Sequence, residues 1–472
     1  MPEYQLRDHQ TRVSKKVSGG QSVLAAHSMG SGKTLTGLDS ARAALEKSKS
    51  GRALFVVPAP LRDNMAKEMD KHKISKELRD RIDIDSYEGA TNRKDQYKAQ
   101  GYEFMLMDEA HRLRNPGLRS SAVREIAQSA KQRLLLTGTP IYNQRSDIAK
   151  VINTTAGHEV MPEDARKFDD AFIAKKVVKP GLLMRILGVT PGEKLSVKNK
   201  AMLRRIGKEY MDRFDAMESM KQEFPDRTDE TIHVDMSKDQ LRAYQYAEGT
   251  IPLPLRLKIR MNLPLDKKEA QNLNAFSSGI RQISNTNAGF TTSKPSSPKI
   301  DRIVSDFEDM MRDNPNHKGI IYSNYLGSGL EEAHRQLKEK GVPTVLFTGE
   351  TTAAERKQAI EDYNSGKVKA ILLSSAGSEG LDLQGTRSFQ GMEPHFNNEK
   401  INQVIARGIR YKSHAHLPEK ERKVRVMRYA STKPKLFGHF SRGQGIDDYL
   451  KHSADTKDSL TQELLDAMSN DG

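Results

Sequence analysis

The stretch "SVLAAHSMGSGKTLTG" (22–37) places a glycine-rich loop between an apolar run and a helix-like pattern. Gly30 and Gly32 let the backbone curl until its N–H groups face a phosphate, and a helix N-terminus adds partial positive charge. Lys33 would reach the β- and γ-phosphates, and the Thr34 hydroxyl would bind Mg²⁺. The strict phosphate-loop pattern has glycine where His27 stands, so the match is good but incomplete. The stretch predicts nucleotide binding at a strand-to-helix turn.

Short apolar runs alternate with amphipathic stretches on both sides of this loop, which predicts a parallel sheet with helices on both faces. The expected strands of this first region are 22–27, 53–58, 104–107 and 133–137. The pattern returns later in the chain, with expected strands at 318–324, 343–349, 369–375 and 422–430. One helix there should begin with a capping box formed by Thr352 and Glu355. The fold class is therefore α/β, with two parallel-sheet lobes.

The middle of the chain is different in composition, being rich in Lys, Arg, Met and Glu, with helix-like periods such as 199–220. A Ser/Pro-rich segment at 291–299 is typical of a linker, and 446–468 has the pattern of one amphipathic helix. We expect four parts: lobe one at 1–155, a helical insertion with its linker at 156–295, lobe two at 296–442, and a helical tail at 443–472.

The charge of the 472-residue chain favours a polyanionic partner, because 77 Lys and Arg against 62 Asp and Glu give a net charge of +15. A merely soluble basic protein is the alternative at this point. The absence of cysteine excludes disulfides and thiolate metal sites. The N-terminus lacks the apolar core of a signal peptide, and no run is long enough to span a bilayer. We expect a soluble intracellular protein that does not act in a membrane.

The stretch "FMLMDEAHRLRN" (104–115) ends an apolar run in two adjacent carboxylates. Neighbouring side chains of a strand point to opposite faces, which disfavours Asp108 and Glu109 as a glycosidase pair. Asp108 and His111 lack the spacing of a helical zinc site. Carboxylates that follow a buried parallel strand emerge at the edge of the sheet where ligands bind. With a phosphate loop upstream, we expect Asp108 to hold Mg²⁺ and Glu109 to polarise the attacking water, rather than a plain solvated pair.

These stretches resemble the motifs of superfamily-two helicases, in particular the Swi/Snf-type branch. In lobe one, "HSMGSGKT", "MDEAHRLRN" and "LLLTGTPIYN" (134–143) are similar to motifs I, II and III, and "LFVVPAPLRDNMAKE" (54–68) to motif Ia. "YQLRDHQ" (4–10) is similar to the glutamine motif. The segments at 202–210, 224–244 and 277–284 are similar to the linker pattern of this branch.

The resemblance continues through the second lobe. "KGIIYSNY" (318–325), "ILLSSAGSEGLDL" (371–383) and "QVIARGIR" (403–410) are similar to motifs IV, V and VI. The sequence that follows motif VI is similar to that of phage and large-DNA-virus members, including poxvirus-type early transcription and nucleoside triphosphatase proteins. A viral or phage member would act in the host cell cytoplasm or be carried in the virion.

The resemblance implies two RecA-like lobes with ATP and Mg²⁺ in a cleft. Gln10 would read adenine, and Arg407 and Arg410 would be arginine fingers, with Gln403 one turn earlier. The implied nucleotide-binding residues are Gln10, Ser28, Met29, Gly30, Ser31, Gly32, Lys33, Thr34 and Asp382. The residues implied to relay the nucleotide state are His111, Thr137, Thr139 and Gln403. Those implied to grip a nucleic-acid backbone are Pro58, Ala59, Ser374 and Ser375.

A basic middle segment is a further candidate for contact with nucleic acid. Its cations are Lys175, Lys176, Lys198, Arg204 and Arg205. A solvated face of a helical protrusion would show the same charges, and both interpretations stay open. Aromatic residues make up only 6% of the chain and tryptophan is absent, so extensive stacking on single-stranded bases is not expected.

The prediction from these features is a DNA-dependent ATPase motor that translocates on double-stranded DNA. Its rivals are a strand-separating or branch-migrating helicase, and an ATPase factor of viral transcription. DEAH-type RNA helicases fit less well, because their linker and motif VI patterns differ. DNA, double-stranded or branched, is the expected partner, with proteins of replication or transcription as further partners. The sequence leaves the oligomeric state open.

Overall fold

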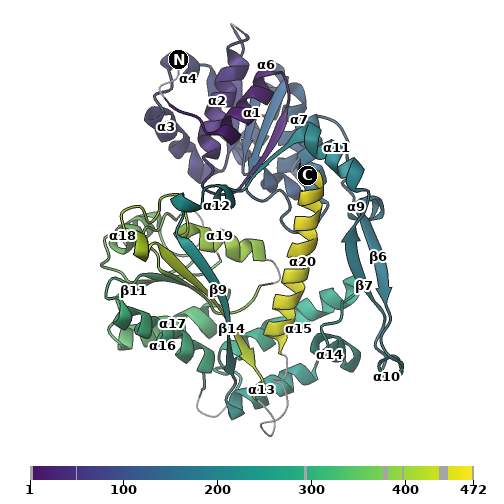
Figure 1. Ribbon diagram of the computed structural model, residues 1–472, viewed down its shortest axis with the longest axis vertical. Helices are drawn as coiled ribbons and strands as arrows, with labels where there is room; N and C mark the ends of the chain where they lie inside the picture. Colours follow the sequence, from purple (N-terminus) through teal and green to yellow (C-terminus); the bar gives the residue numbers. More distant parts are fainter. Residues whose placement is uncertain are drawn as a thin grey trace. The chain divides into compact units, whose positions relative to one another are not determined.

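The computed structural model describes residues 4–48, 50–291, 295–375, 381–395, 398–434 and 445–469. The chain divides into two compact units (Figure 1). The first unit comprises Met1–Ala174, Ser196–Met220 and Leu460–Gly472. The second comprises Lys175–Leu195 and Lys221–Ser459.

A six-stranded, all-parallel sheet forms the centre of the first unit, in the order β3-β2-β4-β5-β1-β8. Its strands are β1 (Val23–His27), β2 (Ala53–Val57), β3 (Ile82–Ser86), β4 (Phe104–Asp108), β5 (Gln132–Thr137) and β8 (Met211–Phe214). Strands β1 and β2 are buried along their whole length, because helices cover both faces of the sheet. Parallel strands bring their carboxyl ends to one edge, where β1, β2 and β4 lead into the predicted motifs.

The helices of the first unit pack on the faces of its sheet. One layer packs helices α1, α2 and α3 on alternate strand residues such as Val23, Ala25, Phe55 and Leu106. The helices are α1 (Asp8–Ser18), α2 (Lys33–Leu45), α3 (Arg62–Lys71), α4 (Lys76–Arg79), α5 (Tyr87–Asn92), α6 (Lys94–Gln100), α7 (Leu118–Ser129), α8 (Asp147–Ala156), α9 (Ala165–Phe172), α11 (Lys200–Tyr210) and α12 (Ala216–Ser219). Short 3-10 turns are η1 (Ala59–Leu61) and η2 (Ala110–Arg114).

The second unit contains another six-stranded parallel sheet, in the order β11-β12-β10-β13-β14-β9. Its strands are β9 (Asp226–Asp235), β10 (Gly319–Tyr322), β11 (Thr344–Phe347), β12 (Ala370–Leu373), β13 (Ser388–Gly391) and β14 (Lys423–Thr432). Strands β9 and β14 run side by side in Figure 1, paired from Asp226 with Lys423 to Asp235 with Thr432. Helices α16 and α17 pack on one face through Phe307, Ala333 and Leu337.

A second core of this unit belongs to the helices of the middle segment. Helices α13, α14 and α15 pack on the first turns of α20, with Tyr244, Leu273 and Leu450 buried between them. The helices are α10 (Leu182–Ile186), α13 (Lys238–Gly249), α14 (Leu253–Arg260), α15 (Lys267–Asn285), α16 (Pro298–Asp313), α17 (Glu331–Glu339), α18 (Ala353–Asn364) and α19 (Asn398–Gly408). Single turns are η3 (Lys221–Glu223), η4 (Leu326–Leu330) and η5 (Glu419–Glu421). Strands β6 (Ile173–Val178) and β7 (Gly192–Val197) form a separate two-stranded sheet.

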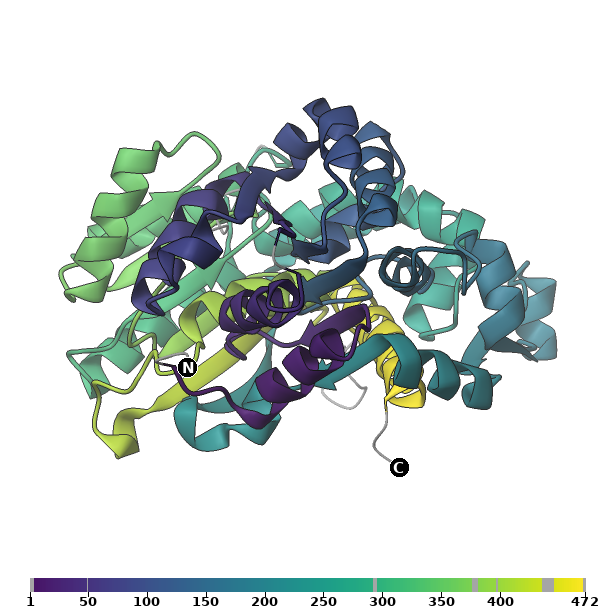
Figure 2. The ribbon, with the colours of Figure 1, turned by 90° about the horizontal axis from the view of Figure 1, so that it is seen from above.

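The eight strands expected from the apolar runs are all present, which confirms the α/β fold class with two parallel sheets. The capping box of α18 is confirmed, because Thr352 Oγ1 accepts from Glu355 N and Glu355 Oε2 accepts from Thr352 N. The C-terminal pattern is confirmed by α20 (Ile446–Met468), a single yellow helix in both views (Figures 1 and 2).

The middle segment is not purely helical, and the helix expected over 199–220 is wrong in its second half. Helix α11 ends at Tyr210, and β8 follows at once and extends the first sheet beside β1. Strand β9 extends the second sheet. Both are edge strands rich in charged residues, so they lack the apolar runs that reveal a central strand. Of the expected linker 291–299, residues 292–294 lie outside the described residues, and α16 begins at Pro298.

Candidate nucleotide site

The phosphate loop connects the end of β1 to the start of α2. Gly30 has φ 83° and Gly32 has φ 78°, so both residues adopt the left-handed conformation that favours glycine. A Cβ atom on Gly32 would lie 2.6 Å from Gln10 Nε2. The loop thus leads its backbone directly into the N-terminus of α2, the arrangement that binds phosphate groups.

Two polar side chains of the loop are placed for a phosphate ligand. Lys33 Nζ donates to His27 O at 3.1 Å and to Ser28 O at 3.4 Å, within its own loop. Ser31 is 1% exposed, and its Oγ has no hydrogen-bond partner among the described residues. Thr34 lies in the first turn of α2. Ser31 thus offers a buried hydroxyl without a partner, and Lys33 offers an ammonium in the same loop, so that a nucleotide phosphate fits as the missing acceptor.

The glutamine-motif helix α1 supports the loop from the side. Gln10 Nε2 donates to Gly32 O at 3.2 Å and to Ser31 O at 3.4 Å, while Gln10 Oε1 accepts from Arg7 N. His9 Nε2 bonds to Ser31 O at 2.8 Å. In this structure the Gln10 amide therefore fixes the phosphate loop, and its role in reading adenine stays a prediction.

The adjacent carboxylates Asp108 and Glu109 lie where β4 ends at the carboxyl edge of the sheet. Glu109 has φ 50° and turns the chain into η2, and its N–H donates to Asp108 Oδ1 at 2.9 Å. Tyr87 Oη donates to Asp108 O at 2.7 Å. Burial, and then the charge of Glu109, raise the pKa of Asp108, while Lys33 acts in the opposite direction. A divalent cation would offset this cost and favour the charged carboxylate.

A path of close polar contacts leads from Glu109 to the end of β5. His111 Nδ1 lies 3.3 Å from Glu109 Oε2 and 3.2 Å from Thr137 Oγ1, which accepts from Thr139 N at 3.1 Å. The structure thus brings together three of the residues implied to relay the nucleotide state. A Cβ on Gly138 would lie 3.7 Å from Lys33 Nζ, so the path returns to the phosphate loop.

An aromatic ring that stacks on His111 was not predicted from the sequence. The Tyr142 ring stacks on the imidazole with centroids 5.4 Å apart and planes within 9°. The Arg114 guanidinium lies 4.1 Å from the centroid of the same ring. Tyr142 belongs to the quoted "LLLTGTPIYN", but a tyrosine in a loop carries no sequence signal for stacking.

A buried charge cluster on the other side of the loop was also missed. His27 Nε2 donates to Asp212 Oδ1 at 2.9 Å, and Arg12 donates to both carboxylate oxygens of Asp212 at 2.6 and 2.8 Å. Burial opposes the charge of Asp212, but the bonds from His27 and Arg12 outweigh it and hold its pKa well below the usual range. His27 occupies the position where the motif has glycine, whereas Asp212 was hidden in the expected helix 199–220.

The remaining predicted residues of the first unit lie at the same edge of its sheet. Pro58 and Ala59 directly follow β2, where Pro58 is buried and Ala59 is exposed at the start of η1. Ser28 Oγ accepts from Ala216 N at 2.7 Å, which ties the loop to the residues after β8. Met29 follows Ser28 in the phosphate loop.

The second unit contains the motif VI residues on α19 and just after it. Gln403 and Arg407 are one turn apart on the helix, and Arg410 follows its end. Arg410 Nη1 lies 3.5 Å from Asp382 Oδ1, and Leu383 N donates to Arg407 O. The structure therefore joins motifs V and VI. Ser374 and Ser375 follow β12, and motif V residues 376–380 lie outside the described residues.

The donor set at the phosphate loop fits magnesium better than a protein-only metal site. Among the described residues, no group of three or more His, Asp or Glu could hold a metal ion. Mg²⁺ is usually held by one or two carboxylates together with substrate phosphates. Thr34 in the first turn of α2, and Asp108, whose carboxylate is close enough to Lys33 of the loop to be affected by its charge, remain the predicted protein ligands.

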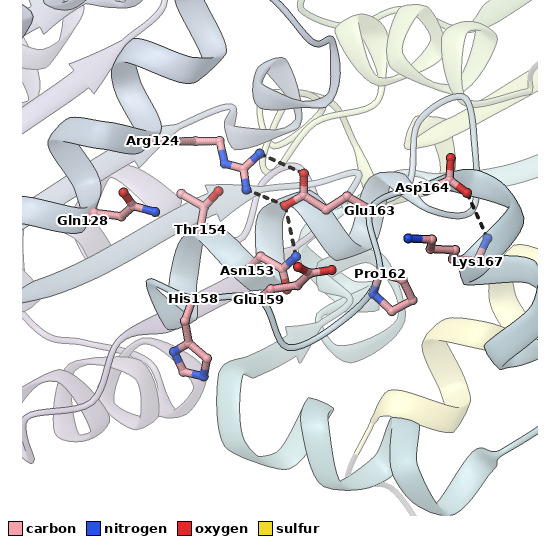
Figure 3. A pocket seen from close by; sticks show the side chains of 10 residues that line it. All are labelled: Arg124, Gln128, Asn153, Thr154, His158, Glu159, Pro162, Glu163, Asp164 and Lys167. Carbon is pink, nitrogen blue, oxygen red and sulfur yellow. Dashed lines mark hydrogen bonds and ion pairs between the residues drawn. The ribbon is translucent and has the colours of Figure 1, made fainter.

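A cavity of about 370 Å³ beside α7 and α8 contains none of the predicted site residues (Figure 3). Arg124 pairs with Glu163, and Asn153 Nδ2 donates to Glu163 Oε1 at 3.0 Å. The charged groups that line this cavity thus bind one another.

No helix in the described part of the chain is long and apolar enough to cross a membrane.

Comparison with known proteins identifies three matching family descriptions. SNF2-related domain matches residues 76–289, Helicase conserved C-terminal domain matches 301–412, and Type III restriction enzyme, res subunit matches 3–142. Together these matches span both units and contain motifs I to VI.

Viral proteins are among the similar relatives. An Acanthamoeba polyphaga mimivirus protein, named as an ATP-dependent RNA helicase, is 26% identical over 98% of this chain and 97% of its own length. A Termination factor NPH-I homolog of African swine fever virus is 32% identical over 27% of this chain, which spans only 19% of that relative.

A solved structure shows the same fold. The Hef helicase domain of Pyrococcus furiosus covers 90% of this chain and 95% of its own, with a TM-score of 0.52 and 15% identity. The two parallel sheets thus share the fold of that helicase domain, with two RecA-like lobes. With the phosphate loop and the paired carboxylates, the chain thus carries an SNF2-related domain and a helicase C-terminal domain, and these domains together with its helicase-named relatives support an ATP-hydrolysing helicase or translocase.

Proposed function

We propose that this chain is a DNA-dependent motor that couples ATP hydrolysis to movement along double-stranded DNA. The observation that carries the proposal is the path of close polar contacts from Glu109 through His111 to Thr137 and Thr139. It connects the group placed to act on water with a loop that abuts Lys33. Such a path gives hydrolysis a means of changing the conformation of the sheet edge.

The chemistry follows from the residues at the edge of the first sheet. The loop N–H groups and Lys33 would bind the phosphates, and Thr34 and Asp108 would hold Mg²⁺, which would neutralise part of the phosphate charge. Glu109 orients the attacking water and takes its proton. By the family resemblance, Arg407 and Arg410 supply positive charge to the transition state.

Binding to DNA is supported by charge and by the place of the backbone-gripping candidates. The net charge of +15 favours a polyanion. Pro58 and Ala59 follow β2, and Ser374 and Ser375 follow β12, each pair at the carboxyl edge of its own sheet. Contacts to phosphates would make binding strongly dependent on salt and weakly dependent on sequence.

Steady-state ATP hydrolysis tests the proposal with no nucleic acid, blunt duplex DNA, single-stranded DNA and RNA. We expect duplex DNA to stimulate hydrolysis most, and Glu109→Gln to lower kcat by about 100-fold or more, because it removes the base while keeping the shape. ATP binding by Glu109→Gln should persist. Normal hydrolysis by this variant, or no stimulation of the wild type by duplex DNA, contradicts the proposal.

A second candidate is an RNA or strand-separating helicase. The names of two mimivirus relatives describe RNA helicases, and these relatives are matched over 97% and 80% of their lengths. Greater stimulation by RNA or single strands, with unwinding of labelled forks, would favour this candidate. The NPH-I relatives suggest a third role inside a transcription complex, which recovery of polymerase subunits with the tagged chain would support.

A further inference from the structure

The connection between β6 and β7 exposes an unusual cluster of apolar side chains. Over 177–187, here called the tip, the exposed fractions are 56% for Val177, 68% for Leu182, 65% for Leu183, 73% for Ile186 and 39% for Leu187. On α10 and its cap, Leu182 lies one turn from Ile186, and Leu183 one turn from Leu187. Scattered exposed leucines are ordinary, but a contiguous group marks an interaction surface.

A firm base holds the tip, so its exposure does not reflect a loose loop. Thr190 Oγ1 accepts from Lys258 Nζ at 2.7 Å and donates to Glu269 Oε1 at 3.2 Å. Lys258 is fully buried and pairs with Glu269 at 2.7 Å, which anchors the tip to α14 and α15. Val189 is buried, and its N–H donates to Met184 O at 2.9 Å. A buried lysine persists only where its partners are fixed.

Positive charge surrounds this apolar surface. Residues 173–197 contain five cations, Lys175, Lys176, Lys179, Arg185 and Lys194, against one carboxylate, Glu193. Lys175 lies 4.0 Å from Glu193, and the other four cations form no ion pair within the described residues. The segment contains no aromatic residue, which excludes base stacking on a ring.

We propose that the tip is a wedge that binds nucleic acid at an open base step or duplex end. Leu182, Leu183 and Ile186 contact the faces of bases, and Lys176, Lys179 and Arg185 neutralise the flanking phosphates. Nucleic acid offers both surfaces at once, apolar base faces between anionic strands, and apolar side chains with flanking cations wedge base steps in this way. The inference rests on the proposed function and adds to it a contact that opens the duplex.

Two triple variants separate the apolar from the ionic contribution. Leu182→Ser/Leu183→Ser/Ile186→Ser removes the wedge, and Lys176→Ala/Lys179→Ala/Arg185→Ala removes the cations. Leu118→Ser and Tyr246→Ser are the controls, because these residues are 88% and 85% exposed outside the tip. The probes are a blunt duplex DNA, a forked DNA, a single-stranded DNA and an RNA, each carrying 2-aminopurine beside its end or junction.

The wild type should bind the duplex and forked probes and raise the fluorescence of 2-aminopurine as the base unstacks. The apolar variant should bind them at least 10-fold more weakly and lose this rise. The basic variant should show a shallower dependence of log affinity on log salt, by about 3 for three lost phosphate contacts. The controls should match the wild type, and hydrolysis without nucleic acid should stay unchanged in all variants, which shows that they fold.

Wild-type affinity and fluorescence for the apolar variant would overturn the wedge while leaving the motor intact. Failure of every probe to bind or stimulate the wild type would instead overturn the proposed function. Vesicles of phosphatidylserine and phosphatidylcholine, together with sedimentation equilibrium, test other occupants. If the apolar variant loses only vesicle binding or self-association, the tip serves a membrane or a second copy, and the wedge is wrong.

Discussion

Gly32 shows how strongly single residues constrain the phosphate loop. Its left-handed backbone and its contact with Gln10 both require the absence of a side chain. Glu109 adopts the same backbone region without being glycine, which is a strained conformation of the kind found at functional sites. The sequence predicts the first constraint from the glycine pattern, but nothing in it signals the second.

Gly32→Ala should lower nucleotide affinity by at least 10-fold and destabilise the first unit by about 1–2 kcal/mol. The new Cβ would both strain the loop and collide with Gln10. Fluorescent nucleotide binding and thermal unfolding measure the two effects. Gly101→Ala is the control, because Gly101 has φ 60° but nothing within 4 Å of its added Cβ. Equal losses in both variants would show that backbone strain alone explains the result.

Thr137→Val removes the hydroxyl that joins His111 to Thr139 while keeping the size of the side chain. We expect nucleotide binding to stay unchanged and the ratio of stimulated to basal hydrolysis to fall by about 10-fold, as for loss of one positioning bond. Thr154→Val is the matched control, since Thr154 Oγ1 donates to Lys150 O within α8. An unchanged ratio in Thr137→Val would remove this path from the account.

The charge cluster of Asp212 predicts a dependence of stability on pH. Because the folded pKa of Asp212 is lowered, its stabilisation is complete above about pH 4 and is lost as the pH falls further. Burial also lowers the pKa of His27, which adds a loss of the same sign below about pH 6.5. Asp212→Asn should cost about 2 kcal/mol at pH 7 and flatten the acid limb of urea-unfolding free energy between pH 5 and 3. Parallel curves for variant and wild type would refute this assignment.

At the scale of elements, central strands are easier to predict from sequence than edge strands. Apolar runs revealed β1, β2, β4 and β5 because helices cover both of their faces. Strand β9 has no buried residue, its exposed and half-buried residues do not alternate, and it carries five charged side chains, so its pairing with β14 could not be read from periodicity. Such edge strands form because a neighbouring strand offers hydrogen bonds, which is tertiary information.

Helix α20 is held to the second unit by a buried ion pair. Lys299 Nζ donates to Asp447 Oδ2 at 2.8 Å, both side chains are fully buried, and Ser431 N donates to the same oxygen at 2.9 Å. The pair therefore joins α16, β14 and the first turn of α20. Removal of the pair should therefore weaken the packing of all three elements.

Lys299→Met should destabilise the second unit by about 3–5 kcal/mol, because it leaves the Asp447 carboxylate buried without its cation. Lys299→Met/Asp447→Leu should recover part of this loss. Lys451→Met, which breaks the exposed Lys451–Asp455 pair on the same helix, should change the free energy by less than about 0.5 kcal/mol. Urea unfolding followed by circular dichroism measures all three. A loss in Lys299→Met no larger than in Lys451→Met would show that the pair adds nothing.

At the scale of the whole molecule, the sequence predicted the arrangement of elements along the chain better than the contacts between distant residues. The sequence correctly predicts two parallel-sheet units, and in the first unit Asp108 and Thr137 end their strands at the carboxyl edge of the sheet. It could not predict that Asp212 would pair with His27, 185 positions away, or that Tyr142 would stack on His111. These contacts depend on how strands are ordered in the sheet, which a local pattern does not encode.

The central claim is that hydrolysis drives movement along duplex DNA. Displacement of a third strand bound to a duplex tests it most directly, because the third strand leaves only when a motor passes. We predict ATP-dependent release by the wild type and none by Glu109→Gln. Rapid ATP hydrolysis on the same duplex with the third strand left in place would contradict the account.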